Sequence, residues 1–148
     1  MDDFATAKGL VDEALKKIGV DPDTVRGKDA PDVASWTLKR GSAQILVGLA
    51  RREPNRAVFL RVVSPVMTFP DADKREPLFV RLLELNANGL GNCAFGIVGE
   101  RIVALSERPA EGLDSGEVEQ IVRQVAAVAD TYDDRLVQEF GGKRASDK

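Results

Sequence analysis

The chain has 148 residues, of which 43% are hydrophobic and 30% are charged, a composition typical of a single soluble domain with a packed core. Its formal net charge is -3, so no overall positive field attracts nucleic acid, and it contains no histidine. These facts exclude a broadly basic nucleic-acid-binding protein, a histidine-dependent enzyme and a zinc site with histidine ligands.

The first predicted element is an amphipathic helix over residues 3–18. Its apolar residues recur at the 3.6-residue spacing of one helix face: Phe4, Ala7, Val11, Ala14, Leu15 and Ile18. Gly19 is suited to the helix C-cap, and the polar residues 20–32 that follow are interpreted as a connector.

The same end of the chain bears on location. Its first residues, MDDFATAKGL, are acidic where a secretory signal peptide would be basic. The single cysteine, Cys93, fits a reducing compartment, and no apolar run reaches the roughly 20 residues that span a bilayer. We therefore expect a cytoplasmic protein without a membrane partner.

Three strands are predicted next, over residues 34–38, 43–50 and 57–67. In the first, Ala34, Trp36 and Leu38 alternate with polar residues, which is the pattern of a half-buried strand. The other two, AQILVGLA and AVFLRVVSPVM, are apolar at almost every position. Because short polar turns separate the three, we expect antiparallel neighbours in a sheet whose two faces are both covered.

A second helix is predicted over residues 77–87, with Pro77 in its first turn. Its apolar residues sweep an arc of about 220°, whereas a helix lying on one sheet needs a stripe of about 100°. The surplus predicts a homodimer built partly on this helix, with these interface residues: Leu78, Phe79, Leu82, Leu83 and Asn86. The alternative is a helix enclosed within one monomer.

Residues 93–98 and 101–106 are predicted to form a hairpin around Gly99-Glu100, where Gly suits the positive φ of a type II′ turn. A last helix begins after Asp114, with Glu117 three residues on, as in a capping box. The helix ends at Gly141-Gly142. Its apolar residues form one narrow stripe: Val118, Ile121, Val122, Val125, Ala129, Tyr132, Leu136 and Phe140. We expect one domain over residues 1–140 and a disordered tail over residues 141–148.

No cofactor, metal or catalytic site is predicted. Gly89-Leu90-Gly91 follows a helix C-terminus, whose partial negative charge repels phosphate, so these glycines are interpreted as a corner rather than a phosphate loop. The acidic pairs lack the spacing of a calcium loop. Cys93, on a predicted strand, is interpreted as a small core residue.

Residues 82–136 read LLELNANGLGNCAFGIVGERIVALSERPAEGLDSGEVEQIVRQVAAVADTYDDRL. This stretch, with the order of predicted elements, resembles the YbjN-like family, often labelled sensory transduction regulators. The order is also similar to that of class I type III secretion chaperones, small acidic homodimers that hold an effector segment in non-globular form. The resemblance implies an α+β fold, α-β-β-β-α-β-β-α, with a mainly antiparallel five-stranded sheet packed with helices.

The resemblance also implies a non-catalytic, homodimeric, chaperone-like or protein-binding regulatory module. Its partners would be a second copy of itself and an unidentified protein or extended peptide. We expect apolar strips near Trp36 and Leu38 to accept that client by strand addition or in side-chain pockets. Three alternatives stay open: a small-molecule-responsive sensor on the same fold, a dedicated type III secretion chaperone, and a dimer whose exterior is inert.

Overall fold

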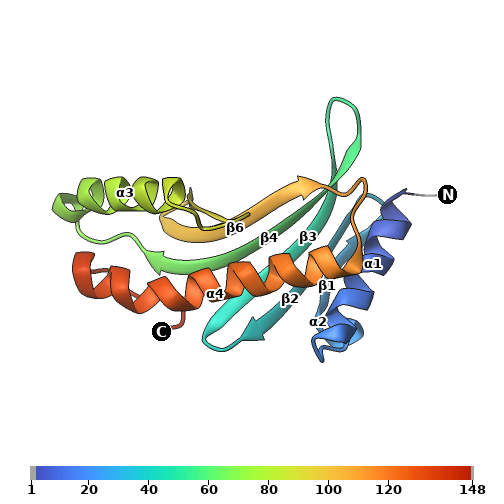
Figure 1. The fold of residues 1–148 in the computed structure, drawn as a ribbon, viewed down its shortest axis with the longest axis horizontal. Coiled ribbons are helices and arrows are strands. Elements are labelled where there is room, and N and C mark those ends of the chain that lie inside the picture. Colours follow the sequence, from blue (N-terminus) through green and yellow to red (C-terminus); the bar gives the residue numbers. More distant parts are fainter. Residues whose placement is uncertain (1–2, 148) are drawn as a thin grey trace.

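A computed structural model describes residues 3–147 and shows an open antiparallel sheet with helices along one side (Figure 1). The elements in chain order are α1 (Asp3–Lys17), α2 (Pro22–Val25), β1 (Arg26–Ala30), β2 (Val33–Arg40), β3 (Ala43–Arg52), β4 (Ala57–Thr68), α3 (Ala72–Ala87), β5 (Ala94–Val98), β6 (Arg101–Pro109) and α4 (Ser115–Phe140). The α+β class and the antiparallel sheet are as expected.

The sheet has six strands in the order β1-β2-β3-β4-β6-β5, so the predicted number of five is wrong. The strand missing from the prediction is β1, which lies in the segment interpreted as a connector. Its sequence, RGKDA, is polar and its residues are exposed or half-buried. Backbone pairing with β2 and an ion pair between Arg26 and Asp12 (2.9 Å) hold it in place, and neither leaves a hydrophobic pattern in the sequence.

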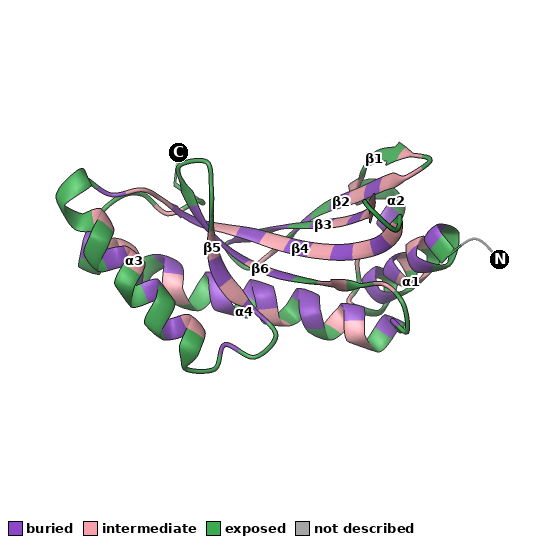
Figure 2. Ribbon diagram, turned by 90° about the horizontal axis from the view of Figure 1, so that it is seen from above, coloured by how far each residue is buried: buried purple, intermediate pink, exposed green. Residues whose placement is uncertain are grey.

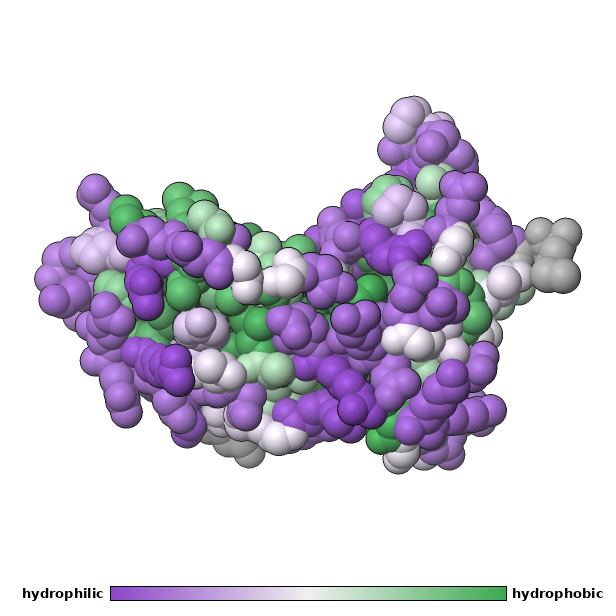
Figure 3. Space-filling view, viewed as in Figure 1, coloured by the Kyte–Doolittle hydropathy of each residue, from purple (hydrophilic) through white to green (hydrophobic). Residues whose placement is uncertain are grey.

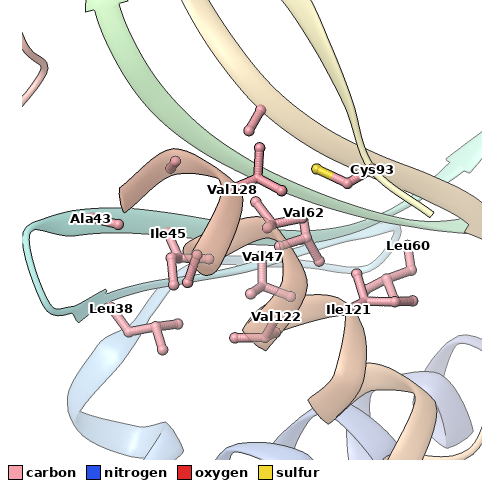
Figure 4. Close-up of a cluster of buried hydrophobic side chains, with 14 of the residues drawn as sticks. Leu38, Ala43, Ile45, Val47, Leu60, Val62, Cys93, Ile121, Val122 and Val128 are labelled. Atoms are coloured by element: carbon pink, nitrogen blue, oxygen red, sulfur yellow. The ribbon is translucent and has the colours of Figure 1, made fainter. Parts of the chain in front are cut away.

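The core lies between one face of the sheet, the inner face, and the long helix α4. Figure 4 shows side chains of α4 pointing onto β3 and β4. The predicted stripe of α4 is buried except for the half-buried Tyr132, whose ring meets Phe95 edge to face at 5.5 Å. The Asp114 carboxylate accepts the Glu117 backbone N–H at 2.8 Å, so the predicted N-cap is confirmed.

The helices cover only this inner face. Figure 2 shows α1, α3 and α4 on the same side of the strands. The opposite face, the outer face, carries no helix in the described chain, so the chain itself covers only one of the two faces that were expected to be covered. Strands that are apolar in both alternating positions predict two apolar faces, but they do not say which of the two the helices cover.

Helix α3 begins at Ala72, five residues earlier than predicted, so Pro77 lies inside the helix rather than in its first turn. The cost of this proline is low here because Pro77 is exposed, as is Asp73, whose carbonyl would have received the missing N–H. Water can satisfy that carbonyl. The hairpin turn is as predicted: Val98 pairs with Arg101, and Gly99 has φ of 62°.

Residues 141–147 also differ from the expected disordered tail. The Thr68 N–H donates to Lys143 O at 2.9 Å, and Met67 bridges Arg144 in an antiparallel pairing. The segment therefore has a defined backbone path beside β4, while the last residue of the predicted tail, 148, lies outside the described residues.

Candidate functional site

The outer face carries a shallow hollow of about 390 Å³, here called the outer groove. Its floor and walls come from four neighbouring strands and a part of β2: Ser35, Leu46, Val47, Gly48, Arg61, Val63, Pro65, Val98, Arg101 and Val103. Leu46 is 41% exposed and Val98 50% exposed, and large apolar side chains at such positions often mark a binding surface.

The strand register builds this groove from residues far apart in the sequence. Leu46 of β3 lies opposite Val63 of β4, and Val63 lies opposite Leu105 of β6. Pro65 lies opposite Val103 in the next row. Because cross-strand partners point to the same face, these residues form a continuous apolar strip across the middle of the sheet.

Two local features shape the groove. Pro65 has no N–H to give to a ladder, and it lies where the β4–β6 register shifts, a position in which proline is tolerated inside a sheet. Gly48 and Gly96 have no side chains on the outer face, and a Cβ at Gly96 would lie 2.9 Å from the Leu105 Cδ2 atom. The Leu105 side chain therefore packs directly against the backbone of Gly96.

Charged side chains border the groove. Glu107 pairs with Arg52 and also with Arg61 at 2.8 Å, and hydrogen bonds from these two arginines hold the pKa of Glu107 below its ordinary value. Arg101, at the other end, is exposed and makes no ion pair within residues 3–147. The groove thus has an apolar floor, one neutralised charge cluster and one arginine available to an acidic partner.

The two residues predicted to bind a client lie elsewhere. Trp36 is 0% exposed and Leu38 is 4% exposed, and both point to the inner face. The indole N–H of Trp36 donates to the Asp12 carboxylate at 3.1 Å, which ties β2 to α1. The alternation of β2 identified their shared face correctly, but that face is covered by helices rather than open.

The residues predicted for a dimer interface differ in their surroundings, and most of them make contacts within the chain. Leu78 and Leu82 are buried within the chain, and Phe79 packs edge to face on Phe69 at 5.4 Å. Asn86 pairs with the backbone of Phe95: its Oδ1 accepts the N–H at 2.7 Å and its Nδ2 donates to the carbonyl at 3.2 Å.

Leu83 alone of that set is highly exposed, at 68%, with Val80 at 51% three residues before it. The two share one face of α3. Asn86 forms hydrogen bonds with outward-facing backbone groups of β5. Because β5 is an edge strand, these groups would otherwise have only water as a partner. Figure 3 shows hydrophobic surface gathered at the left, over α3.

The described residues contain no cluster of three or more His, Cys, Asp or Glu side chains that could hold a metal ion. Burial raises the pKa of the Cys93 thiol, which disfavours the nucleophilic thiolate. No helix within residues 3–147 is long and apolar enough to cross a membrane.

The profile of one protein family matches residues 5–148, and its description is T3SS (YopN, CesT) and YbjN peptide-binding chaperone 1, abbreviated TY-Chap1. The chain belongs to this family. The predicted resemblance to YbjN-like proteins and type III secretion chaperones is thereby confirmed, and the TY-Chap1 description supports a chaperone-like, protein-binding role. No curated protein matches the chain.

Solved structures show the same fold. The ExsC-ExsE complex gives a TM-score of 0.64 at 17% identity, covering 92% of this chain and 97% of the other. The HopA1-SchA chaperone-effector complex gives 0.55 at 15%, covering 86% and 92%. The ExoU-SpcU complex from the type III secretion system of Pseudomonas aeruginosa gives 0.56 at 14%, covering 88% and 97%. The TY-Chap1 chain therefore shares the architecture of chains found in these complexes.

Sequence reasoning missed the apolar residues that line the outer groove: Leu46, Val63, Pro65, Val98 and Val103. A signal for them was present, because the strands are apolar at both alternating positions and one set must therefore face away from the helices. Its interpretation required knowing that α3 lies on the same side as α4.

Proposed function

We propose that the protein is a non-catalytic, chaperone-like module that binds an extended segment of another protein in the outer groove and works as a homodimer. The observation that carries the proposal is the apolar strip on the uncovered outer face. Its open form suits an extended chain better than a small molecule, because small-molecule sites usually enclose most of their ligand. Its regulatory role would consist of sequestering that segment.

Family membership and fold support the same proposal. The TY-Chap1 description names peptide binding, and the similar structures named above include a chaperone-effector complex. We therefore assign the client of this chain to the same chemical class, a polypeptide.

The groove is tested with a matched pair of substitutions on β3. Leu46→Asp places a carboxylate in the apolar floor, whereas Gln44→Asp changes an exposed residue on the same face that does not line the groove. The assay is suppression of aggregation of a chemically denatured model protein, followed by light scattering. Wild type and Gln44→Asp should suppress aggregation, and Leu46→Asp should lose most of the effect. Equal activity in all three proteins would contradict the proposal.

The homodimer rests on Val80 and Leu83, two large apolar side chains left in water on one face of α3. A second copy of α3 would remove both from solvent. Light scattering should give a dimer mass for the wild type at tens of micromolar. Leu83→Asp should give a monomer with an unchanged circular dichroism spectrum, and Arg81→Asp, an exposed control on the same helix, should remain a dimer. A monomeric wild type would refute the homodimer.

A further inference from the structure

Residues 141–147, here called the tail, run beside the end of β4 and make one isolated antiparallel bridge with it, between Arg144 and Met67. The Thr68 N–H donates to Lys143 O at 2.9 Å, and the Ala145 N–H donates to Val66 O at 3.0 Å. These are the backbone contacts of an added antiparallel strand. Figure 2 shows the C-terminus on the side of the sheet opposite α4.

The tail occupies an edge that the sheet itself leaves free. The β3–β4 ladder ends at the pair Leu46 and Val63, so the later residues of β4 have no strand partner on that side. Met67 forms its bridge there with Arg144. The exposed edge of a strand can pair with any extended chain. Here it pairs with the chain's own tail.

Besides these contacts, the Lys143 N–H donates to Thr68 Oγ1 at 3.0 Å, and Arg144 pairs with Asp147 within the tail at 2.9 Å. Lys143, Ala145, Ser146 and Asp147 are exposed, so the tail buries little apolar surface. Arg144 pairs with Asp134 of α4 at 2.9 Å, but both side chains are in contact with solvent, and such pairs contribute little. The tail is therefore held by hydrogen bonds and solvent-exposed ion pairs rather than by packing in the core.

One position of the tail has a strict size limit. Gly142 has φ of +83°, and a Cβ there would lie 2.7 Å from the Thr68 carbonyl oxygen. Only glycine fits such a close approach without strain. Two residues later, Arg144 places its guanidinium beside Asp134.

We propose that this edge of β4, from Val66 to Thr68, is a second peptide site, and that the tail fills it until an extended segment of a client replaces it. The fitting segment carries glycine followed two residues later by arginine or lysine, which reproduces the close approach to Thr68 and the ion pair with Asp134. The inference rests on the proposed protein-binding function, but it concerns a surface separate from the outer groove.

The test uses the full chain and a fluorescently labelled peptide, FGGKRASDK, that copies residues 140–148. Gly142→Val should release the chain's own tail, because the new side chain meets the Thr68 carbonyl. Release is read from faster hydrogen exchange of the Thr68 N–H. The variant should then bind the peptide at least about fivefold more tightly than wild type, since its site is open more of the time. Ser146→Val, an exposed change in the same tail, is the control.

Two altered peptides test the recognition itself. Proline in place of Ala145 removes the donor to Val66 O, and glutamate in place of Arg144 faces Asp134. The proline peptide should bind far more weakly to the Gly142→Val protein, and the glutamate peptide should bind more weakly by a smaller factor, because the ion pair it reverses is exposed to solvent. Leu46→Asp in the outer groove should leave the affinity for FGGKRASDK unchanged, so failure of the groove proposal and of this one are distinguishable.

Four results would overturn the inference. The first is tail release without tighter peptide binding, and the second is equal binding of the proline peptide. The third is Thr68 N–H protection that persists in both Gly142→Val and a second releasing variant, Arg144→Glu. The fourth is exchange of tails between two copies of the protein with no peptide binding, which would assign the edge to a second copy instead of a client.

Discussion

Ile45 and Leu46 are neighbours on β3 with side chains of the same size, yet Ile45 is fully buried and Leu46 is 41% exposed. The difference is that between the two faces of the sheet. On the inner face α4 completes a packed core, while on the outer face a similar set of apolar residues stays in water. Apolar character alone thus does not separate a residue that holds the fold together from one available to a partner. The difference is whether a helix covers the face of the sheet on which the residue lies.

The largest effect on stability is expected for α3, because this one helix carries both a buried and an exposed leucine. Leu78 is 0% exposed and Leu83 is 68% exposed. Leu78→Asp should unfold the chain, because an unpaired buried charge costs several kcal/mol, roughly the whole stability of a small domain. Leu83→Asp should leave the thermal unfolding of the monomer nearly unchanged. Circular dichroism melts of both variants check this, and similar melting temperatures would remove the distinction.

A smaller effect is expected for the pair on β3. Ile45→Ala should lower the free energy of unfolding by about 2–5 kcal/mol, the range for deleting a buried aliphatic side chain. Leu46→Ala should lower it by less than about 1 kcal/mol, since the side chain keeps much of its contact with water in the folded state. Urea unfolding followed by circular dichroism measures both. A cost for Leu46→Ala as large as that for Ile45→Ala would show that the outer face is also part of the core.

The next effect is a pH-dependent change in stability caused by Asp133 of α4, a carboxylate on the helix side of the sheet. Burial raises the pKa of Asp133, and the nearby carboxylates of Asp134 and Asp130 raise it further, whereas the Asp134 backbone N–H and Arg144 lower it. Ser42 also faces this group. A folded-state pKa above the ordinary value of 3.8 means that the folded chain binds more protons, so the stability contributed by this group is lost as pH rises through the raised pKa.

Asp133→Asn removes that titration and keeps an oxygen acceptor for the Asp134 N–H. The variant should therefore melt higher than wild type at neutral pH. The gap should close as pH falls through the raised pKa of Asp133, where the wild-type carboxyl takes up its proton. Melting curves of both proteins across this pH range check the sign. A gap independent of pH would mean that burial of the charge is not its cause.

The smallest expected effect is on tryptophan emission. Trp36, the only tryptophan, is fully buried on the inner face and hydrogen-bonded to Asp12. A client bound in the outer groove should leave the emission maximum in place while a dye attached near the groove responds. This differs from the sequence-based expectation that the client binds near Trp36. A saturable shift of Trp36 emission on client binding would place the client on the helix side.

The sequence by itself determined the elements with a strong side-chain pattern. The alternation of Ala34, Trp36 and Leu38, the stripe of α4 with its Asp114 cap and the Gly99 turn all appear in the structure as predicted. The family resemblance also came from sequence alone, through residues 82–136. In each case the information is local, because hydrophobic period, capping and turn chemistry act over a few residues.

Only the tertiary structure decided which face of the sheet stays open, which strands form its edges and where the tail lies. The side-chain period groups Leu46 with Gln44 and Ile45 with Val47, but it does not say which group α4 covers. β1 and the tail pair through backbone hydrogen bonds, which every residue type except proline can donate and which therefore leave no pattern in the sequence. Asn86 was predicted to face a second copy, but its side chain forms hydrogen bonds with the backbone of Phe95 at the edge of the sheet. This contact also depends on backbone groups, so the sequence pattern does not reveal it.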